Sequence, residues 1–365
     1  MDDGDLRRLH ALLLKYSHVP AFGAAAAAAT ALAAAADVTA AGPVTVRAAP
    51  PSQEAMQGAT RKRKGLTLAS SVISNKKGRR SRRLNPNTPT SEMYTIVPEL
   101  ESLRDEWPGK KLPGEDSWIT VFGDDDDASV EHWHESGFAE KAEKVLQRPV
   151  MVQFPPNVPR ATCKALLEFI SCFFFGLTCV YSECGVDETQ FVGPTQNEYG
   201  PQCNADELIY HLEEQARQNR AWQVMVTSHD LGSDGVNFLF GLSSFDAAAC
   251  VLSVSRLADV PGGMEGPAFF VQMARLISHE MGHNLGFYHC VVNECLMNGC
   301  NTLEEAMATP IELCPQCLSK LWLASECQGN LAERYEHLVG ILRKMGAEKD
   351  ASFLERMRDV LHGHG

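Results

Sequence analysis

The chain has 365 residues, of which 44% are hydrophobic, and a formal net charge of −13. This composition is ordinary for a globular protein, and the length allows two modest domains or one domain with an extension. No run reaches the ~20 strongly apolar residues that a membrane helix needs, and the acidic start Met1–Asp5 is unlike a secretory or mitochondrial signal. We therefore expect an intracellular protein, cytoplasmic or nuclear, that does not bind membranes.

Charge is unevenly distributed along the chain. Residues 61–83 contain ten Lys and Arg and no acidic residue, which leaves 23 basic against 46 acidic residues elsewhere. The clusters Arg61–Lys64 and Lys76–Arg83 are typical of a nuclear-import signal or a nucleic-acid contact, and a solvated tail without a fixed partner is the alternative. Phosphates would repel the acidic remainder, so we expect no nucleic acid on the globular part.

The first 148 residues show little sign of a packed core. Residues 1–90 combine an alanine-rich tract with the basic clusters and offer little apolar surface, which predicts a disordered extension. Residues 91–148 form a transition segment with some apolar residues, among them Trp118 and Ile119. Its acidic run, Asp124–Asp127, lacks the alternating spacing of a calcium-binding loop and is expected to be a solvated loop.

From Pro149 the pattern becomes that of a packed α/β domain, expected over residues 149–345, with a helical tail at 346–365. Short apolar runs bounded by turn residues alternate with segments of helical periodicity, which predicts a mixed sheet covered by helices. Asn204 and Pro267 are residues typical of helix starts. The expected strands are 150–154, 178–181, 223–226, 236–240 and 250–254, and the expected helices are 160–174, 204–220, one from 267 and those of the tail from 318.

The stretch from His279 to His289 has the chemistry of a catalytic zinc site. In H-E-x-x-H, His279 and His283 lie four residues apart and face the same side of a helix, and Glu280 is placed to act on a zinc-bound water. Gly286 can end the helix in the left-handed conformation and turn the chain, so that His289 becomes a third ligand. Three protein ligands and one open position are typical of a catalytic zinc.

A second pattern follows directly. Cys290 and Cys295 are separated by a loop from Cys314 and Cys317, and paired cysteines at this spacing predict a structural zinc site. Four unligated thiols are the alternative. The remaining cysteines show no comparable pairing and are expected mainly as small core residues.

These motifs together resemble the archaemetzincins, a family of zinc-dependent metallopeptidases. The resemblance rests on H-E-x-G-H-x-x-G-x-x-H-C-x4-C-x-M followed by C-P-x-C, it covers roughly residues 150–345, and it includes a similar segment at 230–241. It implies a metzincin-like zincin fold with a central zinc-binding helix. It also implies Met297 as the methionine beneath the metal, and two zinc ions with these ligands: catalytic His279, His283 and His289, and structural Cys290, Cys295, Cys314 and Cys317.

The expected activity is hydrolysis of peptide bonds in a peptide or protein substrate by a monomer, with Glu280 as general base. The sequence does not choose between aminopeptidase and endopeptidase action. We also expect the strand ending near Val254 to present a backbone edge to an extended substrate. The alternative is a non-catalytic, zinc-stabilised protein that binds peptides or, through its basic tail, nucleic acid. An intact Glu280 disfavours it, because a binding protein needs no base beside the metal.

Overall fold

The computed structural model describes residues 67–69, 100–109, 117–122, 129–182, 186–193, 200–233, 236–245, 247–257, 260–325 and 330–363. All of them fall in one unit, Leu66–Gly365. Of the extension expected at 1–90, only strand β1, Thr67–Ala69, is described, so the expected disorder stays a prediction. The acidic run Asp124–Asp127 and both basic clusters lie outside the described residues.

A six-stranded mixed sheet forms the centre of the fold, which confirms the predicted sheet type. Strands β3, β2, β5 and β9 run parallel in that order, and β8 and then β1 add antiparallel beyond β9. Their bounds beyond β1 are β2 Val150–Gln153, β3 Cys179–Tyr181, β5 Trp222–Thr227, β8 Gly241–Ser244 and β9 Ala249–Ser253.

The expectation of an open backbone edge near Val254 is wrong. That strand is β9, and it pairs with β5 on one side and with β8 on the other, so both of its edges are occupied. The strand beyond it is β8, whose other side pairs with β1.

A smaller sheet of three strands has the order β4-β6-β7. The strand predicted at 236–240 is β7 and ends at Leu239, after which the chain passes through Phe240 into β8. Strand β8 was not predicted, because Gly-Leu-Ser-Ser has a low intrinsic β propensity and becomes a strand through its pairing with β9. The bounds are β4 Cys203–Asn204, β6 Leu231–Ser233 and β7 Val236–Leu239.

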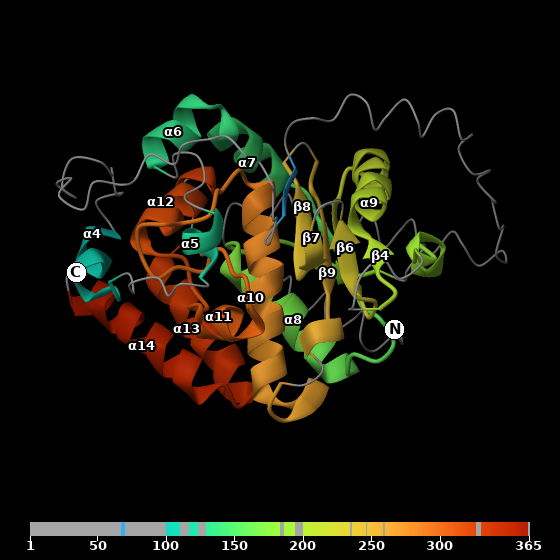
Figure 1. The fold of residues 1–365 in the computed structure, drawn as a ribbon. Helices are drawn as coiled ribbons and strands as arrows, with labels where there is room; N and C mark the ends of the chain where they lie inside the picture. The colour runs from blue at the N-terminus through green and yellow to red at the C-terminus, as the bar shows by residue number, and fades with distance from the viewer. Residues whose placement is uncertain are drawn as a thin grey trace, which may run out of the picture. The chain divides into compact units, whose positions relative to one another are not determined.

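The two faces of the large sheet carry different helices (Figure 1). Side chains alternate along β5, so Val224 and Val226 lie in the core shared with α8 and α10, whereas Met225 packs on the α9 side. The helices match their predictions: Asn204 caps α9 by accepting hydrogen bonds from the N–H groups of residues 206 and 207, and Pro267 opens α10. Their bounds are α8 Arg160–Phe173, α9 Ala205–Asn219 and α10 Pro267–Asn284.

The segment 91–148 is helical over most of its described part. Its buried Leu103, Trp133 and Val145 join the same core as the strands and helices that follow residue 149. The indole N–H of Trp133 donates a 2.9 Å hydrogen bond to the carbonyl oxygen of Leu285, just beyond the end of α10. This segment therefore helps to form the surroundings of α10. Its helices are α4 Glu101–Glu106, α5 Trp118–Phe122, α6 Val130–Glu135 and α7 Phe138–Leu146.

The chain after α10 is mainly helical, as predicted for its tail. One buried ion pair ties this part to the core: the guanidinium of Arg334 donates to both carboxylate oxygens of Glu312, at 2.5 and 3.0 Å, and its Nε donates to the carbonyl oxygen of Phe173. The Arg334 and Glu312 side chains are 2% and 0% exposed. The helices are α11 Leu303–Ala308, α12 Pro315–Ala324, α13 Leu331–Lys344 and α14 Glu348–Gly363.

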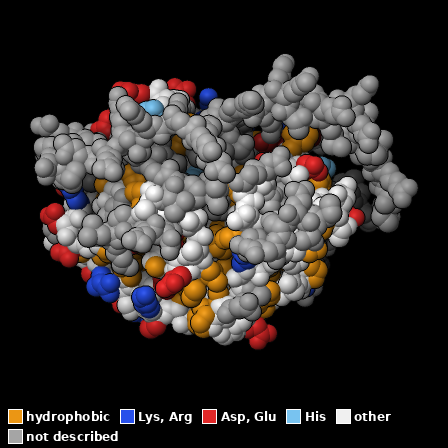
Figure 2. All heavy atoms as spheres, in the orientation of Figure 1, with side chains coloured by type: hydrophobic (Ala, Val, Ile, Leu, Met, Phe, Trp, Pro, Cys, Tyr) orange, Lys and Arg blue, Asp and Glu red, His pale blue; other side chains and the backbone are white. Residues whose placement is uncertain are grey.

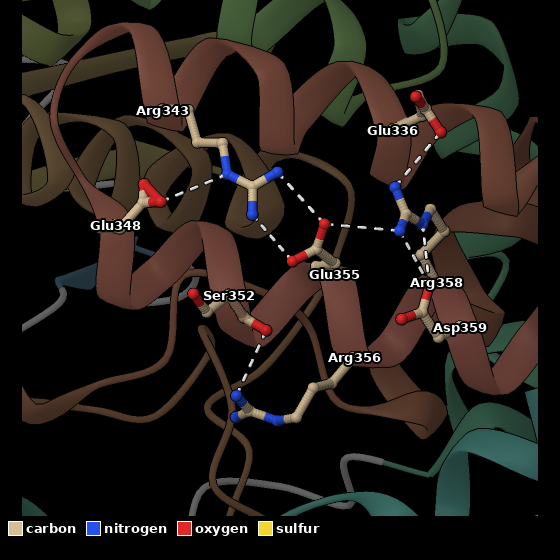
Figure 3. A network of polar contacts seen from close by, with 8 residues as sticks. All are labelled: Glu336, Arg343, Glu348, Ser352, Glu355, Arg356, Arg358 and Asp359. Atoms are coloured by element: carbon tan, nitrogen blue, oxygen red, sulfur yellow. Dashed lines mark hydrogen bonds and ion pairs between the residues drawn. The ribbon is translucent and has the colours of Figure 1, made fainter.

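A second group of ion pairs lies on the surface, between α13 and α14 (Figure 3). Arg343 contacts Glu348 and Glu355, and Arg358 bridges Glu355 to two further carboxylates. Glu355 is 31% exposed, and water screens pairs of this kind. Among the residues that the structure describes, no helix combines the length and apolar character that crossing a bilayer requires.

These two groups of ion pairs predict different costs when one partner is removed. Glu312→Gln should lower the free energy of unfolding by about 3–5 kcal/mol, because it leaves the Arg334 charge buried without a counterion. Glu355→Gln is the matched control on the surface and should cost less than about 1 kcal/mol. Urea unfolding of both variants measures the difference. Equal losses would contradict the role given to the buried pair.

Candidate active site and metal centres

The first two histidines of the motif lie one above the other on α10. His279 and His283 are 7% and 0% exposed, and their Nε2 atoms face each other at 3.1 Å. Each Nδ1 lies within hydrogen-bond distance of a main-chain carbonyl oxygen, that of Leu296 at 2.8 Å for His279 and that of Phe287 at 2.7 Å for His283. These contacts orient both rings, and they leave each Nε2 turned toward the same point.

The turn after α10 brings the third histidine to this point. Gly286 has φ +79°, the left-handed conformation predicted for it, and its N–H donates to the carbonyl oxygen of His283. A side chain here would also meet the ring of Phe138, because an added Cβ would lie 2.5 Å from it. Beyond the turn, the His289 ring lies 5.4 Å from that of His279 and 4.8 Å from that of His283, centroid to centroid.

The three histidines fit one zinc ion. Their potential ligand nitrogens all lie within 4.8 Å of one another. Two nitrogens bound to a tetrahedral zinc at about 2.05 Å lie roughly 3.3 Å apart, close to the 3.1 Å between the two Nε2 atoms. Burial, with the neighbouring imidazoles, holds the pKa of His283 well below its usual range, so this side chain is neutral and keeps a lone pair for a metal.

The carboxylate of Glu280 lies between α10 and β8 and is fully buried. The hydroxyl of Ser243 lies 2.5 Å from Oε2 and 2.8 Å from the main-chain carbonyl oxygen of Glu280. Gly241 leaves room for this side chain, because a Cβ at that position would lie 2.6 Å from Oε1. Sequence reasoning missed both residues. The only signal in the sequence was the similarity of residues 230–241 to the archaemetzincin pattern.

Met297, which the resemblance implies as the methionine beneath the metal, lies against α10. It is fully buried, and its sulfur would be 2.6 Å from a Cβ added at Gly282, so the helix approaches this methionine through a glycine. The carbonyl oxygen of Met297 accepts a 2.7 Å hydrogen bond from the N–H of Cys290. The methionine turn is thereby joined to the residue that follows His289.

The four predicted cysteines form a second buried group. Their sulfurs lie within 4.8 Å of one another, and those of Cys290 and Cys314 are 3.8 Å apart, which is also roughly the distance between two thiolates on one tetrahedral zinc. Hydrogen bonds from the other three thiols lower the pKa of Cys290, whereas burial raises the pKa of Cys295. Four thiolates this close together would repel one another strongly, so a cation between them is needed to hold all four, and this donor set fits zinc.

A chain of hydrogen bonds links the histidine group to the buried ion pair. The carbonyl oxygen of Leu296 contacts Nδ1 of His279, and the N–H of Leu296 donates to the carbonyl oxygen of Glu312 at 2.9 Å. The side chain of Glu312 in turn binds Arg334 of α13. The loop that follows Cys295 is therefore anchored to a distant helix.

The other cysteines that the structure describes belong to neither group. Burial raises the pKa of Cys203 and Cys300 to about 12, and that of Cys163 to about 11, so these thiols remain protonated. Cys163, Cys203 and Cys250 are core residues, as predicted. Cys184 and Cys327 lie outside the described residues.

Three histidines on a helix and the turn that follows it, above a buried methionine, define a metzincin-type zinc centre. The model of peptidase family M54 matches residues 216–322, which contain both metal groups. The archaemetzincin of Archaeoglobus fulgidus is 33% identical over 96 residues, which cover 26% of this chain and 57% of that protein. Archaemetzincin-2 of Rattus norvegicus is 27% identical over 206 residues, covering 48% and 57%. Over the residues that hold both metal groups, the chain is therefore similar to peptidase family M54, the archaemetzincins.

The match spans a little over half the length of these curated relatives. Among solved structures, the archaemetzincin of Methanopyrus kandleri is 21% identical with a TM-score of 0.41, covering 49% of this chain and 95% of that one. A zinc-dependent peptidase from Methanocorpusculum labreanum is 18% identical with a TM-score of 0.42, covering 47% and 99%.

Metal analysis of two variants tests the two groups separately. The purified wild type should carry about two zinc ions, and His283→Ala should carry about one, because the loss of one imidazole leaves only two ligands at the histidine group. Cys314→Ser should lose the other zinc ion and melt at a lower temperature, since a structural zinc contributes to folding. Two zinc ions in His283→Ala, or an unchanged melting temperature in Cys314→Ser, would contradict the assignment.

Proposed function

We propose that the chain is a zinc-dependent metallopeptidase, with His279, His283 and His289 as ligands of the catalytic zinc and Glu280 as the general base. The proposal rests chiefly on one observation: the Glu280 carboxylate is buried and oriented one residue from a group of three histidines that fits zinc. When bound, zinc polarises the scissile carbonyl and lowers the pKa of water to about 7.

The protein residues supply proton transfer and orientation. Glu280 takes a proton from the attacking water and later delivers it to the departing amine. The Ser243 hydroxyl holds Oε2 of that carboxylate, and β8 lies directly against it, so the base has little freedom to turn away. His279 and His283 are held by the carbonyl oxygens of residues 296 and 287, which keep the ligand nitrogens fixed.

An extended substrate fits the outer side of β8. This strand is antiparallel to β9 and contacts Glu280 through residues 241 and 243, so a peptide added beyond it would run beside the base. In the described structure β1 of the same chain pairs there, with Leu68 opposite Ser243. Substrate and β1 would therefore compete for one edge.

A cavity of about 50 Å³ beside His279 favours a particular kind of substrate side chain. Most of its lining is apolar, and the charge of Arg275 is engaged by Asp350 at 2.7 Å. We propose that it receives a small apolar side chain of the substrate. The lining residues are Phe240, Leu257, Gln272, Arg275, Leu276, His279, Leu296, Asn298, Cys300, Ala306 and Thr309.

The alternative function is that of a zinc-stabilised binding protein. A buried, oriented carboxylate beside the metal ligands favours the enzyme, because a protein that only binds peptides needs no general base. On the described part of the face in Figure 2, Lys and Arg side chains are interspersed with Asp and Glu, which disfavours a nucleic-acid surface there. The basic clusters lie outside the described residues, and steep loss of DNA affinity with rising salt would reveal their contribution.

We also propose an intracellular location. All ten described cysteines are unpaired, and four of them form a group suited to a metal, which is the pattern of a protein kept in a reducing compartment. Nuclear import through the basic clusters stays a prediction.

The proposed activity covers both aminopeptidase and endopeptidase action. Mapping the cleavage sites in a peptide library would show whether cleavage starts from a free amino terminus.

The role of Glu280 predicts a loss of turnover without a loss of metal. Glu280→Ala should keep two zinc ions and lower kcat by about 10²–10⁴-fold, the usual contribution of a general base. Gly241→Ala should keep the zinc as well and lower kcat by about 10²-fold, because the new methyl group displaces the carboxylate. Substantial hydrolysis by purified Glu280→Ala would exclude Glu280 as the base.

The cavity predicts a change in specificity. Ala306→Leu should fill the space and lower kcat/KM about tenfold for peptides that carry a larger apolar side chain at this subsite, relative to those with Gly or Ala. Ala308→Leu on the same helix is the control, because Ala308 is exposed and does not line the cavity. Identical cleavage profiles for the wild type and both variants would contradict the assignment of this cavity.

A further inference from the structure

We propose that Trp118 of α5 is a positioning residue for His289, and that it slows the release of metal from the histidine group. This inference rests on the proposed role of His289 as a zinc ligand. Trp118 precedes the residues matched by the family model by almost a hundred positions. The chain thus supplies to its metal site a side chain that the motif does not contain.

The contact between the two rings is close. The centroids of the Trp118 and His289 rings are 4.4 Å apart, with 59° between their planes. Both side chains are buried, 5% exposed for the tryptophan and 1% for the histidine. Figure 1 draws α5 beside the C-terminal half of α10, where the other two histidines lie. An indole in this position limits rotation of the imidazole and excludes water from one side of it.

Two features hold the indole in place. Gly299 lies against its ring, since a Cβ added at this glycine would be 2.3 Å from Cδ2 of Trp118. The main-chain N–H of Trp118 donates to the carboxylate of Glu305, at 3.1 Å from Oε1, and the N–H of Asn301 donates to Oε2 of the same carboxylate at 2.7 Å. Glu305 therefore joins the start of α5 to the loop that follows Met297.

The third ligand depends on such support more than the other two. His279 and His283 are part of a regular helix, whereas His289 lies in the turn beyond it. Aromatic side chains from the upstream helices contact this turn along its length. Trp133 donates to the carbonyl oxygen of Leu285, Phe138 packs on Gly286, and Trp118 packs on His289. Of these three, Trp118 is the one in contact with a ligand.

The test measures zinc transfer from purified protein to a chromophoric chelator. The phase from the histidine group is identified as the one missing in His283→Ala. Trp118→Ala should speed this phase about 10–100-fold, the usual effect of removing a group that orients a ligand, whereas Trp118→Phe should stay within about threefold of the wild type. Glu305→Ala should behave like Trp118→Ala, because it releases the main chain of Trp118.

Trp107→Ala is the control for a general loss of packing. Trp107 is also buried and comes from the same segment, but it packs on Phe353 of α14 and donates a 2.6 Å hydrogen bond to the carbonyl oxygen of Glu294, in the loop of the cysteine group, rather than contacting a histidine ligand. It should lower the melting temperature without changing the histidine phase. Release from Trp118→Ala at the wild-type rate would overturn the inference. A wild type without the histidine phase would instead contradict the proposed function itself.

A second measurement does not require Trp118→Ala to fold. With Co²⁺ bound at the histidine group, the emission of the adjacent tryptophan should be strongly quenched. Trp118→Phe should therefore remove the most strongly quenched part of the tryptophan fluorescence, and the absorption bands of Co²⁺ should shift in Glu305→Ala as His289 changes orientation. Equal quenching in the wild type and Trp118→Phe would place Trp118 away from the metal and overturn the inference.

Discussion

The close contact of α10 with its neighbours is the constraint on which the site depends. On one side the helix meets β8 at Gly241, and the room left by this glycine is filled by the Glu280 carboxylate. On another side Gly282 lets the helix rest on the sulfur of Met297. A side chain at either glycine would move the base or the methionine turn. The two glycines therefore contribute to the geometry of the site as much as the ligands do. Close-packed interiors transmit small shifts, so an added side chain at either position would displace its neighbours.

The same loop, which carries Leu296, contacts both metal groups. His289 and Cys290 are adjacent in the chain, and Leu296, which lies between the paired cysteines, contacts His279 through its carbonyl oxygen. The N–H of the same residue reaches Glu312, whose charge is buried against Arg334. Removing either charge would leave the other buried without a counterion, at a cost of about 3–5 kcal/mol. A zinc ion bound by the four cysteines would stabilise the same loop and thereby help to orient the histidines.

Local patterns in the sequence predicted most of the central elements. Pro267, the apolar stripe of α10 and Gly286 act within one helix, and the structure agrees with all three predictions. Strand β8 could not be predicted in this way, because Gly-Leu-Ser-Ser becomes a strand only through pairing with β9. The error about the edge near Val254 has the same cause, since an unrecognised strand covers it. Ser243 and Gly241 were missed for this reason as well.

The role of the segment before residue 149 could not be predicted from local sequence patterns either. Its apolar residues are sparse and its charged runs conspicuous, so local composition indicates a transition rather than a core. Yet Trp133 and Phe138 contact the turn between α10 and His289, and the partner of each lies well over a hundred residues further along the chain. Such contacts leave no periodic signal in the sequence. Because this turn carries only one of the three histidines, the upstream helices affect the third ligand selectively, while the first two depend on α10 itself.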